Sequence, residues 1–358
     1  QDGVLATSML LACVGAAAAS SAPPMSSDDA NFLLDSVPRW SWPGEASSSP
    51  GPELNVSFYV SRSRGLKFVQ TDARGEGFVK DVFRLMASPC ATEASPATII
   101  DIGANTGYYS MLAAVFGCPV IAFEPQPGCS PSFKAARVRN SLAKIKVRYI
   151  PKPVSSRAAV IEVPSRGCAV TNQAKTEVGS EAEAKGGGRA GGGGRAGRRR
   201  RGGGRGGKGG GRRDAGMTTV ATVSIEEVLR GSSARVRLVK IDTEGAEVNV
   251  LRSLLPVLGQ LENLVVETSV GWWLRRYNVS RHEGAELYAS LLEQHGFALA
   301  RVSTGKLIEG GAQMRAYIHA FPSDGYWGQV DMWFARDGAL LRRANPLMRA
   351  RKSFFNFL

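Results

Sequence analysis

Thr98-Ile-Ile-Asp101-Ile-Gly103-Ala-Asn105-Thr-Gly107 is the stretch that decides the fold. Its first five residues form a mostly apolar run, which is typical of a strand buried on both faces of a sheet. The two glycines let the backbone turn tightly and approach a ligand. A helix is expected from about residue 107 to 116, and its first N–H groups can bind a carboxylate. The stretch therefore predicts a strand, a cofactor-binding loop and a helix.

The spacing of this loop is D-x-G-x-x-x-G, which differs from the dinucleotide pattern G-x-G-x-x-G. Asp101 and Asn105 carry groups that can hydrogen-bond the amino and carboxylate groups of a methionine-like ligand. Glu124 ends the next predicted strand, at residues 119–124, where an acid can accept both ribose hydroxyls of an adenosine. Nicotinamide-binding and methyl-donor-binding folds share this combination, so the loop and the acid leave both cofactors open.

A second polar segment, Lys240-Ile-Asp242-Thr-Glu244-Gly-Ala-Glu247, closes a predicted strand at residues 236–242. Three carboxylates this close are costly unless they are solvated, paired or used. Asp242 is a candidate base, whereas Glu247 lies in the first turn of a predicted helix, where it can act as a cap. Glu267 ends the following strand and faces the same crevice by topology.

His282 is a third candidate base, in a helix predicted at residues 282–295, although most histidines at such positions are surface or core residues. Asp242 and a neighbouring carboxylate could hold a metal ion, but the sequence gives no complete ligand set, so we assign no metal residue. Trp272 and Trp273 are as compatible with a wall of the acceptor pocket as with a hydrophobic cover of the sheet.

Alternation of strands and helices continues along the rest of the chain and indicates a doubly wound sheet. The predicted fold class is α/β, with a mostly parallel sheet of seven strands flanked by helices. Besides the strands named above, extended segments are expected at residues 146–150, 158–163, 220–223, 264–267, 297–302, 316–321 and 330–335.

Five segments together resemble the FkbM family of methyltransferases: residues 100–110, 122–127, 223–228, 240–251 and 265–267. The Lys-Ile-Asp-x-Glu-Gly-Ala-Glu segment is the most distinctive of them. The resemblance implies a Rossmann-like class I methyltransferase fold, S-adenosylmethionine as methyl donor, and often O-methylation of a hydroxyl. It implies that the cofactor is held by Asp101, Gly103, Asn105, Gly107 and Glu124. It also implies that Asp242, Glu244 and Glu247 lie near the donor end, but it does not identify the base.

The 358 residues carry a net charge of +14, and 43% of them are hydrophobic. Nine arginines and one lysine lie within residues 186–213, and removing them leaves +4 on the rest of the chain. Residues 179–216 are rich in Gly and Arg and cannot bury enough apolar surface to become ordered. We interpret them as a disordered insertion in one domain, at residues 53–340, and not as an RNA-binding segment, because no aromatic residue is interleaved for stacking.

Residues 1–52 are interpreted as a leader, containing the apolar run 9–19, and a Ser/Pro/Gly-rich linker. The run suits a signal peptide or a membrane anchor, and residues 341–358 suggest a basic tail. A secretory or membrane-associated location is favoured, with organelle and cytoplasm left open. The five cysteines argue against a disulfide framework and leave room for one isolated disulfide.

The function predicted from the sequence is S-adenosylmethionine-dependent methyl transfer, with O-methylation of a small molecule, glycan or lipid. Asp242, Glu267 and His282 are the candidate catalytic residues. Two alternatives remain: a nicotinamide-dependent oxidoreductase using the same crevice, and a non-catalytic protein that binds nucleic acid through the Gly/Arg tract. Nucleic acid is the less favoured partner, and the sequence does not indicate an oligomeric state.

Overall fold

The computed structural model describes residues 32–37, 40, 54–59, 77–165, 168, 175–178, 216–232, 234–321 and 329–348. The apolar run 9–19, residues 179–215 of the Gly/Arg-rich insertion, and the chain after residue 348 lie outside these ranges. The predictions made for them stay predictions. Within the described residues, no helix is long and apolar enough to cross a membrane.

One eight-stranded sheet forms the centre of the protein, in the order β12-β11-β13-β10-β9-β3-β4-β5. The five strands from β10 to β5 are mutually parallel, and β13 runs antiparallel to both of its neighbours. The predicted α/β class is confirmed, but the sheet has eight strands where seven were predicted, because the two-residue β12 is added at one edge. The strands are β3 (Thr98–Ile102), β4 (Val120–Phe123), β5 (Val147–Ile150), β9 (Val236–Ile241), β10 (Asn263–Ser269), β11 (Leu299–Val302), β12 (Leu307–Ile308) and β13 (Gln329–Ala335).

The direction of winding reverses between β3 and β9. From β3 the chain continues to β4 and β5 on one side, and it then returns to place β9 and β10 on the other side. In open α/β sheets, ligands bind outside the carboxyl ends of the strands at such a switch point. Asp101 of β3 lies in register with Lys240 of β9, so the two polar segments of the sequence meet at this point.

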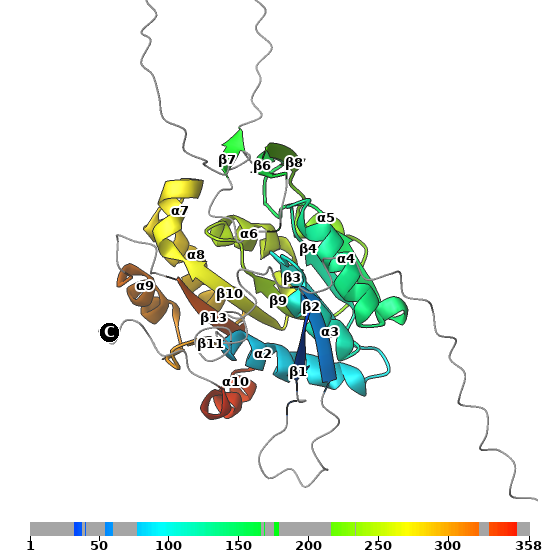
Figure 1. Cartoon of the computed structure of the whole chain (residues 1–358). Coiled ribbons are helices and arrows are strands. Elements are labelled where there is room, and N and C mark those ends of the chain that lie inside the picture. Colours follow the sequence, from blue (N-terminus) through cyan, green and yellow to red (C-terminus); the bar gives the residue numbers. More distant parts are fainter. Residues whose placement is uncertain are drawn as a thin grey trace, which may run out of the picture.

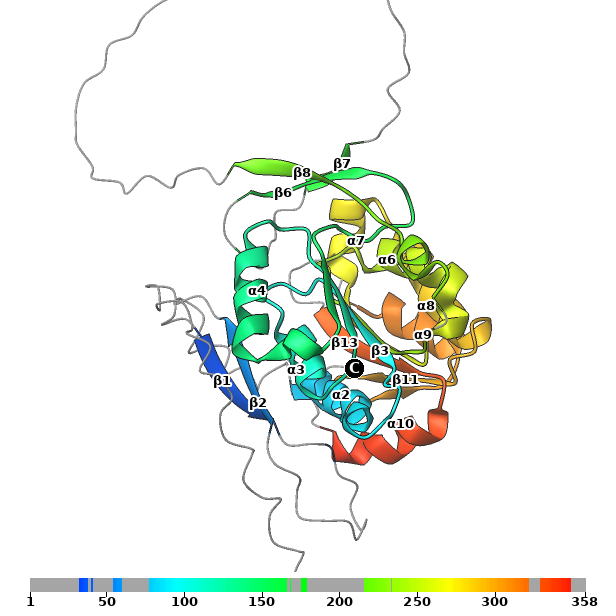
Figure 2. The ribbon, with the colours of Figure 1, turned by 90° about the vertical axis from the view of Figure 1, so that its right-hand side faces the viewer.

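Helices cover both faces of this sheet (Figures 1 and 2). Side chains of α2, α3, α4 and α10 belong to the core on one face, and those of α5 to α9 belong to the core on the other face. The helices are α2 (Gly77–Ala87), α3 (Tyr108–Val115), α4 (Cys129–Arg139), α5 (Ile225–Leu229), α6 (Glu247–Leu254), α7 (Val270–Tyr277), α8 (Arg281–Glu293), α9 (Gly311–His319) and α10 (Gly338–Ala344).

Side-chain alternation along each strand explains why the inner strands are apolar throughout. Ile99 of β3 joins the first core, whereas Ile100 and Ile102 join the second. Successive side chains of a strand point to opposite faces, so a strand covered on both sides needs apolar residues at nearly every position. Asp101 is a buried polar exception in this strand.

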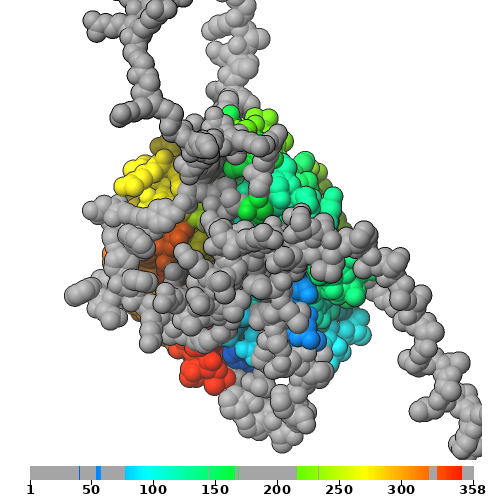
Figure 3. Space-filling model, in the orientation of Figure 1, coloured from blue at the N-terminus to red at the C-terminus, as the bar shows by residue number. Residues whose placement is uncertain are grey.

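Two smaller sheets lie beside the main one. Strands β1 (Phe32–Val37) and β2 (Leu54–Tyr59) form an antiparallel pair. Strands β6 (Val160–Pro164), β7 (Lys175–Val178) and β8 (Met217–Ala221) form the other small sheet, in the order β7-β6-β8. In Figure 3 this green sheet lies between the yellow surface of α7 and the teal surface of α4. β1 lies within residues 1–52, which the sequence analysis interprets as leader and linker, and it pairs with β2 of the predicted domain.

Two further expectations are corrected. Residues 316–321, predicted as a strand, belong mainly to α9. Alternating apolar residues suggested a strand, but Met314 and Ile318 are four positions apart and are both fully buried, which fits one face of a helix. The predicted tail begins too early, because α10 and a 3₁₀ turn continue to residue 347 and bury Leu341 and Ala344.

Gly103 should be intolerant of any side chain. Its φ is +81°, and a Cβ would lie 1.8 Å from the backbone oxygen of Asp242, so either the loop or the end of β9 would have to move. We expect Gly103→Ala to lower the free energy of unfolding by at least about 1 kcal/mol, measured by urea denaturation. Gly259→Ala is the matched control, because no atom lies within 4 Å of its added Cβ. Equal stability of the two variants would contradict this assignment.

Candidate functional site

The loop after β3 contains backbone conformations that residues with a side chain rarely adopt. Gly103, Asn105 and Gly107 all have positive φ, at +81°, +51° and +94°. A Cβ on Gly107 would lie 2.5 Å from the ring of Phe133 on α4. The loop is therefore enclosed between the end of β9 and α4, and its glycines are required by close approach as well as by the turn. The predicted cofactor loop and its following helix, α3, are in place.

Asp101 lies at the base of this loop and is fully buried. Its Oδ2 accepts a hydrogen bond of 2.6 Å from Ser110 Oγ. Its Oδ1 accepts no hydrogen bond from the described residues, although Lys240 Nζ lies 3.6 Å away. A buried carboxylate oxygen without a hydrogen bond is costly, so this atom is a suitable acceptor for the ammonium group of a ligand.

Glu124 follows β4 and turns back toward the loop. Its Oε2 accepts the backbone N–H of Asn105 and its Oε1 accepts that of Gln126, each at 2.9 Å. Burial raises the pKa of Glu124 above its ordinary value, and the two N–H groups offset part of the rise. The sequence predicted that Glu124 and Asn105 serve one ligand, and the structure joins them directly.

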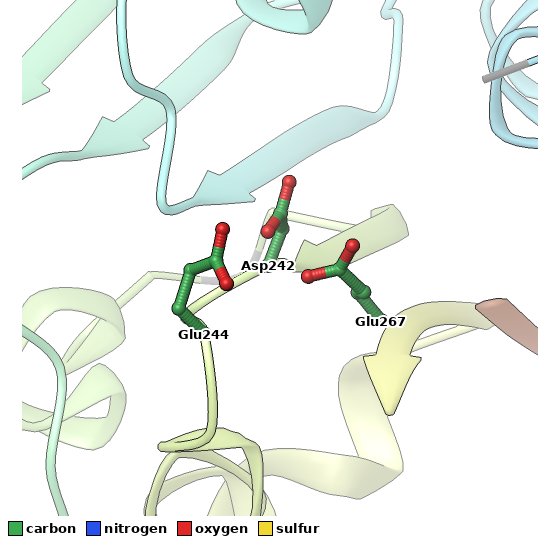
Figure 4. A group of neighbouring side chains, drawn as sticks. All are labelled: Asp242, Glu244 and Glu267. Atoms are coloured by element: carbon green, nitrogen blue, oxygen red, sulfur yellow. The ribbon is translucent and has the colours of Figure 1, made fainter. Parts of the chain in front are cut away.

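Asp242, Glu244 and Glu267 form the second half of the site. One carboxylate oxygen from each lies within 4.8 Å of the others, and Figure 4 shows the three side chains converging from the ends of β9 and β10. Asp242 Oδ2 accepts a 3.0 Å hydrogen bond from Lys240 Nζ, and Glu244 Oε2 accepts one of 3.2 Å from Gln329 Nε2. Glu267 Oε2 is buried and has no such partner in the described part of the chain.

Two of these carboxyl groups, Glu244 and Glu267, hold protons more tightly than usual. Burial, followed by the negative charge of Asp242, raises the pKa of Glu244 to about 7. The same two causes raise the pKa of Glu267 well above its ordinary value. A group with a pKa near 7, such as Glu244, can exchange protons at neutral pH. Carboxylate oxygens are also ligands of hard cations, so these three are the described residues that could hold one.

Glu247 differs from its neighbours in role. It is fully buried, and its two oxygens accept the backbone N–H of Gly245 and the indole N–H of Trp273, at 2.6 Å and 2.9 Å. These bonds fix the first turn of α6 and the position of α7. The interpretation of Glu247 as a capping residue fits these contacts. They also place Trp273 in the core, so of the tryptophan pair only Trp272 is left as a candidate for the pocket.

His282 is not brought to the carboxylates by any described contact. It lies in the first turn of α8 with its side chain 74% exposed, 3.9 Å from Glu286, and its ring stacks on that of His319. His319 ends α9, and a strand had been expected there. The two histidines thus form a surface pair at the ends of neighbouring helices.

Lys240 also belongs to this site, although the sequence analysis assigned it no role. Lys240 is buried at the next-to-last position of β9, where a cation needs an acid nearby. This charged residue in the strand is the signal by which the sequence could have revealed its role.

The structure also contains two disulfides, Cys90–Cys118 and Cys129–Cys168, where the sequence left room for one. Wide spacing concealed them, because the pairing is made by tertiary contacts.

The family model described as "Methyltransferase FkbM domain" matches residues 101–299. A solved SAM-dependent methyltransferase from Agrobacterium tumefaciens is 11% identical with a TM-score of 0.35, over 84% of this chain and 74% of that one. Precorrin-6y C5,15-methyltransferase from Geobacter metallireducens is 10% identical with a TM-score of 0.31, over 72% of this chain and 87% of that one. WbdD, solved with a kinase inhibitor, is 12% identical with a TM-score of 0.35, over 74% of this chain.

The chain spans 42% of the length of WbdD. No curated protein matches it significantly. Likenesses at these TM-scores say nothing about substrate or mechanism. The family match carries more weight, because it spans the loop after β3, the acidic segment after β9 and the end of β10.

Titration of Glu247 should be visible in protein stability. Burial raises its pKa from 4.5 to about 7 in the folded protein. The folded state therefore binds this proton more tightly than the unfolded chain does. The contribution of protonated Glu247 to the free energy of unfolding is complete below about pH 4.5 and is lost as the pH rises through about 7.

We expect the difference in the free energy of unfolding between the wild type and Glu247→Gln to shrink by up to about 3 kcal/mol from pH 4.5 to 8. Urea denaturation of both proteins at several pH values measures this difference. Trp273→Phe removes a hydrogen bond that lowers the pKa of Glu247, so it should steepen the dependence. A difference between wild type and Glu247→Gln that stays constant with pH would contradict the assignment.

Proposed function

We propose, from the premise that this chain belongs to the family of FkbM-domain methyltransferases, that it moves a methyl group from S-adenosylmethionine to a hydroxyl of a small molecule, glycan or lipid. The observation that carries the proposal is the meeting of two chemically different half-sites at one switch point. The loop after β3 can hold a cofactor, and the carboxylates after β9 and β10 can accept a proton.

Residues of the first half-site fit S-adenosylmethionine. Asp101 Oδ1 is a buried acceptor that receives no hydrogen bond from the described residues, and it suits the ammonium group. The N–H groups at the start of α3 suit the carboxylate. Glu124 already accepts two backbone N–H groups, but its oxygens keep lone pairs for the ribose hydroxyls. Gly103 and Gly107 keep the backbone close to the ligand, where any Cβ would clash.

Methyl transfer requires little more from the protein than alignment and proton removal. When bound, S-adenosylmethionine supplies a methyl group that is already activated by its sulfonium. The protein must hold the acceptor oxygen in line and exclude water. Asp242 and Glu267, at the ends of adjacent strands, are placed to accept the hydroxyl proton. Lys240 Nζ, 3.0 Å from Asp242, compensates the negative charge of that carboxylate.

Two features support passage through an oxidising compartment, and we propose the secretory route on that basis. Disulfides persist outside the reducing cytosol, and the described residues contain two of them. The sequence also contains two Asn-x-Ser glycosylation sequons, Asn55-Val-Ser57 and Asn278-Val-Ser280, and both asparagines are exposed. Detection of N-linked glycan on the protein expressed in its own secretory cell would support the route.

Cofactor binding tests the first half-site. We expect calorimetry to detect binding of S-adenosylmethionine and none of NAD. Asp101→Asn and Glu124→Gln should each weaken the affinity for S-adenosylmethionine by about tenfold or more, because each removes a charged hydrogen-bond acceptor. Glu226→Gln, an exposed acid on α5, is the matched control. A folded wild-type protein that binds no S-adenosylmethionine would overturn the proposal.

Methyl transfer to a panel of lipid, glycan and phenolic hydroxyls tests the second half-site. With an acceptor in hand, Asp242→Asn and Glu267→Gln should lower the rate by about 10²–10⁴-fold, the usual contribution of a general base. The raised pKa of Glu267 should make the wild-type rate rise with pH above the ordinary carboxyl range. His282→Ala should keep most of the activity, and a large loss there would move the base to that residue.

A further inference from the structure

The two disulfides lie at opposite ends of the strands of the main sheet. Cys118 lies two residues before β4, and Cys90 lies in the 3₁₀ turn after α2, so their bond is at the amino ends of the strands. Cys129 opens α4, beyond the carboxyl end of β4, and Cys168 follows β6. Only the second disulfide is therefore on the side of the switch point.

Cys168 directly contacts the cofactor loop. Its Sγ lies 3.0 Å from Asn105 Oδ1, an oxygen that also accepts the backbone N–H of Thr106 at 2.8 Å. Asn105 holds a positive φ of +51°, a conformation that needs support from its surroundings. Its own N–H binds Glu124 Oε2. A continuous chain of contacts thus runs from the disulfide through Asn105 to the acid proposed for the ribose.

The partner cysteine fixes the other wall of the same loop. Cys129 is fully buried in the first turn of α4. One turn further along α4, Phe133 closes over Gly107. The disulfide therefore ties the segment at residue 168, which contacts the loop at Asn105, to the helix that encloses the loop at Gly107.

We propose that the Cys129–Cys168 disulfide is a positioning element of the cofactor site, which holds Asn105 and Glu124 ready for the adenosine end of the ligand. This inference rests on the proposed function. It assigns different tasks to the two disulfides: Cys90–Cys118 stabilises the fold, whereas Cys129–Cys168 also sets cofactor affinity.

Reduction by a dithiol should accordingly weaken binding. A thiolate of the reagent attacks the partly exposed Cys168 sulfur, and the buried Cys129 leaves as a thiolate, which takes up a proton. The second thiol of the reagent then releases Cys168, so the protein gains two thiols and the reagent becomes a cyclic disulfide.

Affinities of S-adenosylhomocysteine and 5′-methylthioadenosine, measured by calorimetry, test the proposal in wild type, Cys168→Ser and the matched control Cys90→Ser. Both variants should lose thermal stability, because each loses a disulfide. Cys168→Ser should bind both ligands about tenfold or more weakly, and Cys90→Ser should bind them as the wild type does. An unchanged affinity in Cys168→Ser, or an equal loss in Cys90→Ser, would overturn the proposal.

Two further measurements separate positioning from general stability. If the disulfide acts through Asn105, the effects of Cys168→Ser and Asn105→Ala on affinity should not add; full additivity would refute that route. Should Cys168→Ser fail to fold, the folded wild type is reduced with dithiothreitol, its thiols are counted, and ligand binding is measured again. An unchanged affinity after Cys129 and Cys168 have both become free thiols would contradict the positioning role. A wild-type protein that binds neither ligand would overturn the proposed function and this inference together.

Discussion

Contact between the loop after β3 and the end of β9 is the constraint on which the rest of the site depends. The backbone N–H of Asp242 donates to the oxygen of Ile102 at 3.0 Å, and Gly103 leaves no room for a side chain beside the Asp242 oxygen. Because the two strands are held this closely, a cofactor at the first loop and a proton acceptor after the second strand are brought side by side. The distance between them is set by backbone contact, which is stiffer than any side-chain arrangement.

This arrangement buries several carboxyl groups, and these groups differ in the partners that stabilise them. Lys240 lies between the two halves, 3.6 Å from Asp101 and 3.0 Å from Asp242, so that one cation serves both strands. Glu247 is stabilised by two donors inside the core. Burial and the negative charge of Asp242 raise the pKa of Glu267 well above its ordinary value.

Enclosure of the loop comes from parts of the chain that are distant in sequence. Phe133 covers Gly107 from α4, and Cys168 reaches Asn105 from beyond β6. These contacts convert a glycine-rich turn, which would be flexible in isolation, into a fixed surface. Asn105 in turn donates its backbone N–H to Glu124, so the rigidity of the loop also helps to orient this acid.

Sequence alone determined the strand, loop and helix around Asp101, the acid at Glu124, and the acidic segment after β9. These follow from local periodicity, glycine chemistry and the carboxyl ends of strands, which act over a few residues. It misplaced a strand at residues 316–321, because α9 and a strand both suit its short apolar alternation. Only the tertiary structure decided that Lys240 joins Asp101 to Asp242, that Glu247 binds Trp273, and that Cys129 pairs with Cys168. Apart from Lys240 and Asp242, those partners are far apart in the chain, and their meeting depends on how whole elements pack, which no local pattern contains.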